Sequence, residues 1–183
     1  MKKESTGRYV FRLAFTLFAI TAVVACCLAA VNGITEPRIR AARAEKATQA
    51  AEAVLPGGGR ERESFPDETG TISKVYESDT GWAIEVSPSG FNGPITMMVG
   101  VSTALKVLGI SIVNQTETAG LGAVSGAKTS AGEAFRDQYQ GLTGPLAVRK
   151  DGGTVDAITG ATITSRAVTA GVNAALDCAA AMD

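Results

Sequence analysis

The sequence predicts an α+β protein, in which an antiparallel sheet with packed helices is joined to a single N-terminal transmembrane helix. Two observations support this fold class. Residues 10–31 form an almost wholly apolar run that is long enough to cross a bilayer as a helix. After residue 71 the spacing of apolar residues changes, and short alternating segments come before an Ala- and Val-rich helical pattern near the C-terminus.

The apolar run defines the first two segments of the chain. We expect residues 1–9 to be a cytoplasmic N-terminus and residues 10–31 to be the transmembrane helix. Basic residues flank both ends of the run, so charge alone does not set its orientation. The alternative is a cleaved signal peptide, because the residues before Cys26 loosely resemble a lipoprotein processing box that would leave a lipidated cysteine. The run continues to Val31, which favours a full span.

Residues 32–70 are expected to be a stalk helix and a linker. Residues 32–55 are rich in Ala, Arg, Glu and Lys, and they either extend the membrane helix or form a separate helix with Pro37 near its start. Pro56 and the glycines that follow it end this helix. Residues 60–70 are charged and typical of a solvated loop.

Residues 71–183 are expected to form the folded domain. Alternation predicts two strands joined by a tight turn at 79–81, and two apolar segments predict buried strands. A short helix, a last strand and a long C-terminal helix follow. The expected strands are 72–77, 82–87, 95–101, 107–114 and 155–158, and the expected helices are 129–139 and 163–181.

Composition excludes several classes of function. The 17 basic and 18 acidic residues nearly balance, so the chain lacks the basic surface of a nucleic-acid-binding protein. The chain has no histidine, which excludes a Ser-His-Asp site and the usual zinc sites. Its three cysteines, Cys26, Cys27 and Cys178, have the spacing of neither a metal site nor a redox pair. Redox chemistry in this chain would therefore require a bound organic cofactor.

The segment from Asp156 to Ser165 is the strongest candidate site. It places small residues and hydroxyls in a turn directly before a helix, and a helix N-terminus has free N–H groups that favour a phosphate. Small residues also let a bulky group approach the backbone. The alternative is an ordinary strand-turn-helix junction, with Thr164 or Ser165 as the N-cap.

Two further glycine-rich segments are candidates for ligand contact. Residues 117–122 combine a carboxylate, a hydroxyl and two glycines after a strand, and backbone N–H groups there could bond a flavin ring. The alternative for this segment is a flexible connector. In the second segment, residues 91–100, the pair Met97 and Met98 is expected to lie in the core of the sheet and not at a cofactor.

Four sequence blocks, in order after the N-terminal apolar run, carry a resemblance to a known family. They are residues 31–37, 93–100, 117–122 and 156–165. With them the chain resembles the G subunit of the Rnf (Rsx) ion-translocating electron-transport complex. It is also similar to the C subunit of the sodium-translocating NADH:quinone reductase. Both carry a domain of the FMN-binding family, which here would be residues 71–183.

The resemblance implies a covalently bound FMN and identifies its attachment residue. The family's motif, D-x-x-(S/T)-G-A-T, ends in a threonine whose hydroxyl is bonded to the FMN phosphate, and this is Thr162 here. Thr164 and Ser165 are the nearest competitors and fit better as phosphate donors or helix caps. The implied recognition residues around the attachment site are Asp156, Thr159, Gly160 and Ala161. The implied flavin-contacting residues are Glu117, Thr118, Gly120, Leu121 and Gly122.

The resemblance also implies partners and a location. A flavin transferase would install the FMN, with magnesium bound at the transferase and no metal in this chain. The other partners would be the remaining subunits of the complex and membrane lipid, with no nucleic acid. The chain would be a single-pass protein of the cell (inner) membrane with its C-terminal domain on the extracytoplasmic side. It would relay electrons as part of an ion-translocating oxidoreductase, without catalytic residues of its own.

Two departures from the family pattern and two other functions stay open. The family usually has Pro at the position of Ala119 and often His at that of Gln115. Ala119 is expected to loosen the loop slightly and alter the flavin environment without loss of binding. The first alternative function is a standalone membrane-anchored FMN flavoprotein or lipoprotein that reduces an extracytoplasmic acceptor. The second is a structural module without a cofactor.

Overall fold

A computed structural model describes residues 6–57 and 59–182. The chain divides into two compact units, Met1–Ala44 and Glu45–Asp183. The described residues of the first unit are helical, and the second unit holds a five-stranded antiparallel sheet with helices. The predicted fold class is therefore confirmed. The second unit begins within the segment that the sequence assigned to the stalk and linker.

Helix α1, Thr6–Val54, contains the predicted membrane span. It includes an 18-residue stretch that is apolar and long enough to cross a membrane, and none of that stretch is buried inside the protein. The helix runs without interruption past Pro37, so residues 32–54 extend the membrane helix and do not form a separate stalk helix. It ends just before Pro56 and Gly57, as the sequence indicated.

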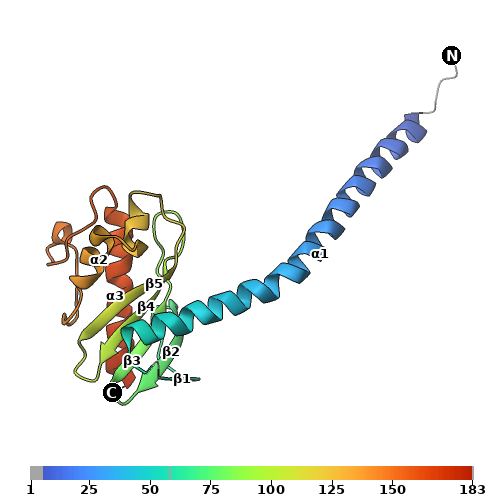
Figure 1. Cartoon of the computed structure of the whole chain (residues 1–183). Coiled ribbons are helices and arrows are strands. Elements are labelled where there is room, and N and C mark those ends of the chain that lie inside the picture. The colour runs from blue at the N-terminus through green and yellow to red at the C-terminus, as the bar shows by residue number, and fades with distance from the viewer. Residues whose placement is uncertain (1–5, 58, 183) are drawn as a thin grey trace. The chain divides into compact units, whose positions relative to one another are not determined.

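The five strands follow one another in both sequence and space (Figure 1). They are β1 Arg60–Arg62, β2 Ile72–Ser78, β3 Gly81–Val86, β4 Thr96–Ser102 and β5 Val107–Asn114. The last four agree with the predicted strands within one residue at each end. Strand β1 was missed, because three charged residues at the edge of a sheet give no alternating pattern.

Helix α3, Thr162–Met182, covers one face of the sheet, and the last turns of α1 cover the other (Figure 1). Side chains of a strand alternate between faces, so neighbours in β4 join different cores. Met97 packs in the core with α3, and Met98 packs in the core with the end of α1. Both are fully buried, which confirms that this pair belongs to the sheet core.

The predicted strand at 155–158 is wrong. Val155 makes only an isolated bridge with Val148. The next residue is held differently, because the backbone N–H of Asp156 donates to Gln138 Oε1 at 2.7 Å and its carbonyl accepts from Gln138 Nε2 at 3.0 Å. A side-chain amide thus takes the place of a neighbouring strand.

The remaining short helices lie between β5 and α3. Helix α2, Ser130–Asp137, matches the predicted helix at 129–139 and starts after Thr129, whose hydroxyl caps the N–H of Gly132. Two 3-10 helices, η1 Gly122–Gly126 and η2 Arg149–Asp151, were not predicted. Helix η1 follows directly from the glycine-rich loop at 117–122.

The end of α1 lies directly on the sheet at a pair of glycines. Gly100 and Gly109 face each other across β4 and β5. A Cβ at Gly100 would lie 2.3 Å from the carbonyl oxygen of Val54, whereas a Cβ at Gly109 would lie 3.9 Å from the nearest atom of Val54. Gly100 therefore provides the space in which the helix end packs.

This close approach predicts different effects for two matched substitutions. Gly100→Ala should lower the free energy of unfolding by about 1–3 kcal/mol, because the helix end must move away from the sheet. Gly109→Ala, its partner in the register, should be tolerated. Urea unfolding of the detergent-solubilised protein checks both, and equal losses for the two variants would contradict the packing described.

Candidate functional site

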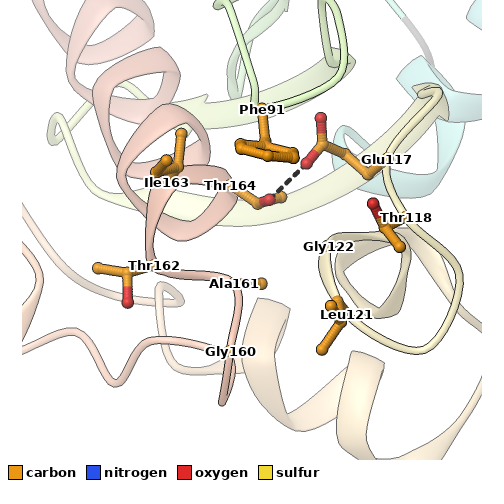
Figure 2. Close-up of a pocket in the computed structure, with 10 residues that line it drawn as sticks. All are labelled: Phe91, Glu117, Thr118, Leu121, Gly122, Gly160, Ala161, Thr162, Ile163 and Thr164. Carbon is orange, nitrogen blue, oxygen red and sulfur yellow. Dashed lines mark hydrogen bonds between the residues drawn. The ribbon is translucent and has the colours of Figure 1, made fainter.

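A pocket of about 370 Å³ lies between the first turn of α3, the loop after β5 and the turn before β4 (Figure 2). Its volume is within the range of sites that hold small organic ligands. The residues that line it are Phe91, Glu117, Thr118, Leu121, Gly122, Gly160, Ala161, Thr162, Ile163 and Thr164. The structure thus brings together two segments that the sequence had marked separately, 117–122 and 156–165.

The Glu117 carboxylate joins the three walls of this pocket. Its Oε1 accepts the backbone N–H of Asn92 at 2.8 Å, and its Oε2 accepts the hydroxyl of Thr164 at 2.5 Å (Figure 2). Only 8% of Glu117 is exposed. Gln115 supports the same loop, because its Oε1 accepts the Glu117 N–H at 2.6 Å.

Glycines make room for this carboxylate. A Cβ at Gly122 would lie 2.6 Å from Glu117 Oε2 and 2.5 Å from Thr164 Oγ1. A Cβ at Gly90 would lie 2.6 Å from Glu117 Oε1. Gly120 in the same loop has a φ of +76°, a backbone conformation that residues other than glycine rarely adopt.

The turn before α3 is braced by one serine. The Ala161 N–H donates to the Ile158 carbonyl at 2.9 Å, and Gly160 has a φ of +76°, as this turn requires. The Ser165 hydroxyl accepts the Ile158 N–H and donates to the Ala161 carbonyl, both at 3.0 Å. The turn is therefore fixed relative to the first turn of the helix.

The N-cap role proposed for Thr164 or Ser165 is wrong. Helix α3 begins at Thr162, so both residues lie inside its first turn. Both are buried, and each donates its hydroxyl proton within the protein, Thr164 to Glu117 and Ser165 to Ala161. Neither has a proton left to donate to a phosphate.

Thr162 differs from both, because its hydroxyl makes no hydrogen bond within the described residues. It is half-buried, at the first position of α3. The backbone N–H groups of Thr162, Ile163 and Thr164 also lack acceptors in this part of the chain, as expected at a helix N-terminus. Such groups, with the partial positive charge of the helix end, favour a phosphate there.

The pocket has an apolar rim. In the described part of the second unit, four large apolar side chains are exposed: Phe91 (66%), Ile163 (50%), Leu121 (42%) and Leu108 (39%). All except Leu108 line the pocket. Exposed apolar side chains gathered at one cavity indicate a ligand with apolar surface.

Several predicted site residues lie outside this pocket. Asp156, Thr159 and Gly120 line a neighbouring cavity of about 500 Å³. The Asp156 carboxylate is exposed and pairs with Arg149 at 2.6 Å. Ser165 is buried and bonds the backbone of the turn at Ile158 and Ala161. The structure therefore separates the implied attachment residue from two of its implied recognition residues.

Phe91 and Ile163 line the pocket but were not among the individual site residues predicted, although each lies within a candidate segment. Phe91 lies in the 91–100 segment, for which the sequence-based site prediction considered only the two methionines and assigned them to the sheet core. The available signal was a large aromatic residue within the glycine-rich turn Gly90–Pro94, where it has no strand neighbours to pack against.

Cys178 has the features of a structural thiol. It is buried on α3, and burial raises the pKa of its thiol to about 11, so the thiol stays protonated at neutral pH. Cys26 and Cys27 lie in the apolar part of α1. Residues 6–57 and 59–182 contain no group of three side chains that could hold a metal ion.

Comparison with known proteins identifies the family. The FMN-binding domain family matches residues 90–177. The chain is 32% identical to the G subunit of the Na(+)-translocating ferredoxin:NAD(+) oxidoreductase complex of Acetobacterium woodii, over 94% of this chain and 92% of that protein. It is 30% identical to the G subunit of the ion-translocating oxidoreductase complex of Pseudomonas aeruginosa, over 94% and 89%. The corresponding Methanosarcina acetivorans protein is 27% identical over 98% and 99%.

The fold, the pocket and the matched family define a membrane protein that carries an FMN-binding domain. More specifically, the chain belongs to the family formed by the G subunits of Rnf-type ion-translocating oxidoreductase complexes. The resemblance inferred from the four sequence blocks is confirmed.

The two pocket threonines should differ in their effect on stability. Thr164→Val leaves Glu117 Oε2 buried without its hydroxyl donor, which should lower the free energy of unfolding by about 1–3 kcal/mol. Thr162→Val removes a hydroxyl without a partner and should change the free energy of unfolding by less than about 0.5 kcal/mol. Urea unfolding of protein made without a flavin transferase measures both. A loss for Thr162→Val as large as that for Thr164→Val would contradict these assignments.

Proposed function

We propose that this chain is the flavin-carrying subunit of a membrane complex that couples electron transfer to ion translocation, with FMN bonded through its phosphate to the Thr162 hydroxyl. The observation that carries the proposal is the unpartnered Thr162 hydroxyl at the start of α3, beside a pocket with an apolar rim in the described part of the chain. An FMN has one anionic end and one flat, largely apolar end. The site offers one region suited to each.

The residues present fit FMN on grounds of chemistry. The free N–H groups of the first turn of α3 would bind the phosphate oxygens. Phe91, Leu121 and Ile163 would contact the apolar ring. Gly122 and Gly160 would allow close approach to the backbone, and Glu117 and Thr118 would supply polar contacts. When bound, FMN would supply the ability to accept and pass on electrons.

The hydrogen bonds around the turn support Thr162 over the other hydroxyls as the attachment residue. Thr164 and Ser165 are buried and donate their protons inside the protein. Thr159 lines the neighbouring cavity. Thr118 lines the same pocket as Thr162 but lies on its opposite side, away from the N-terminus of α3 (Figure 2).

Maturation would require a flavin transferase, to which residues of the attachment segment outside the pocket would be available. Asp156 and Thr159 lie on the turn that leads into Thr162. We assign them to recognition by the transferase, because neither lines the pocket assigned to the flavin. The magnesium would be bound at the transferase.

The membrane helix and the covalent bond would act together. The apolar surface of α1 is suited to lipid, and it would hold the domain beside the other subunits. We assign the domain to the extracytoplasmic side, following the resemblance to the family. A covalent bond would keep the flavin next to its site at an effective concentration on the order of mM. Binding would then not depend on the concentration of free flavin.

The relatives support a subunit over a standalone flavoprotein, a lipoprotein or a structural module. The Acetobacterium woodii relative is named as part of a ferredoxin:NAD(+) oxidoreductase that translocates sodium ions, and the chain covers 92% of its length. A match of this extent favours the same role for this chain, as an electron-relaying part of an oxidoreductase and not an enzyme on its own.

Thr162→Val should abolish covalent attachment of FMN, because valine keeps the shape but has no hydroxyl to bond. Thr118→Val removes the other free hydroxyl of the pocket and should leave attachment intact. The measurement is flavin fluorescence of the denatured band on an SDS gel, from protein made with its transferase, with peptide mapping by mass. A wild-type band without flavin would overturn the proposal.

Glu117→Gln should raise the midpoint potential of the bound FMN by tens of millivolts. Glu117 is buried and forms no ion pair within the described residues, so its carboxylate disfavours negative charge added nearby on reduction, and the neutral amide removes this effect. Glu133→Gln, on the exposed face of α2, is the matched control and should leave the potential unchanged. Spectroelectrochemical titration compares them, and a fall in potential for Glu117→Gln would contradict a nearby carboxylate.

A further inference from the structure

Phe91 is the most exposed large apolar side chain in the described part of the second unit, and it lies at the pocket. It comes from the turn before β4, whereas the other pocket residues come from the 117–122 segment, the turn before α3 and the first turn of that helix. Figure 2 shows its ring on the same side of the pocket as Glu117, which binds the N–H of the next residue, with Leu121 on the other side. Its side chain therefore forms a wall that neither the 117–122 segment nor the 156–165 segment supplies.

The backbone that carries Phe91 is fixed on both sides. The next residue, Asn92, donates its backbone N–H to Glu117 Oε1 and its side-chain amide to the Thr116 carbonyl, both at 2.8 Å. The Thr116 hydroxyl donates to the Asn92 carbonyl at 3.1 Å. On the other side, the Gly90 N–H donates to the Gly93 carbonyl at 2.8 Å. The turn is thus held to the 116–117 segment by three hydrogen bonds.

A fixed backbone with an exposed aromatic side chain is costly unless the side chain has a partner. Phe91 is not part of either hydrophobic core. Leaving such a ring in water forgoes the favourable free energy of burying its apolar surface. A ring held in advance against a cavity loses little further conformational freedom when a flat ligand packs on it.

We propose that Phe91 packs against the isoalloxazine ring of the FMN and forms the pocket wall opposite Leu121. This inference rests on the proposed function, and it assigns a flavin contact to the turn before β4. We favour the isoalloxazine ring over a partner subunit as the group that covers Phe91, because Phe91 lines the same cavity as Thr162. Glu117 then has a second role, since it holds the Phe91 turn and the first turn of α3 at the same time.

A tryptophan at this position tests the contact directly. An indole in contact with an isoalloxazine quenches its fluorescence, whereas a distant indole does not. Full-length Phe91→Trp, matured with its transferase, should lose most of the flavin fluorescence of the wild type at equal flavin content. Leu108→Trp is the matched control, because Leu108 is also exposed but does not line the pocket, and it should keep that fluorescence.

A second variant tests the wall by removing it. Phe91→Ala should make the flavin more accessible to iodide, so that its quenching constant rises toward that of free FMN, while Leu108→Ala leaves the constant unchanged. No loss of fluorescence with Phe91→Trp, or equal losses at 91 and 108, would overturn the inference. That failure is distinguishable from failure of the proposed function, in which the wild-type protein itself would carry no covalent flavin.

Discussion

The Glu117 carboxylate is the constraint on which the site depends. Each of its oxygens accepts one hydrogen bond, from Asn92 in the turn before β4 and from Thr164 in α3. Segments distant in the sequence therefore meet at one buried acidic group. Such a group is stable only while its donors are present, because an unpartnered buried carboxylate is costly. The pocket geometry is thus tied to the folding of the domain.

The glycines of the site follow from this carboxylate. Any Cβ at Gly90 or Gly122 would overlap one of its oxygens, so the small residues are required by the protein's own acidic group as well as by a ligand. The glycines of this loop therefore have a packing role that a mere connector would not require. The loop continues into η1, where the Ser125 hydroxyl donates to the Gly122 carbonyl at 2.8 Å.

Much of the fold was predictable because periodicity reports burial directly. Strands β2 to β5 and helix α3 have strong patterns, and so does the apolar part of α1. The one predicted strand that is wrong lies where a side chain replaces regular backbone pairing. Gln138 bonds both backbone groups of Asp156 and prevents a strand there, and no local pattern reveals a partner 18 residues away. Phe91 was missed for a related reason, since its importance depends on where Glu117 holds its turn.

The proposed attachment segment, residues 156–165, shows what sequence and structure each contribute. The sequence offers four hydroxyls within seven residues, and only the family resemblance distinguished Thr162 among them. The structure adds an independent physical reason, because the hydrogen bonds that stabilise the site use two of the other hydroxyls. Thr164 holds Glu117, Ser165 braces the turn, and Thr159 lies on the neighbouring cavity. The bonds that build the pocket thereby leave Thr162 as the one hydroxyl of the segment that lines the pocket and is free to react.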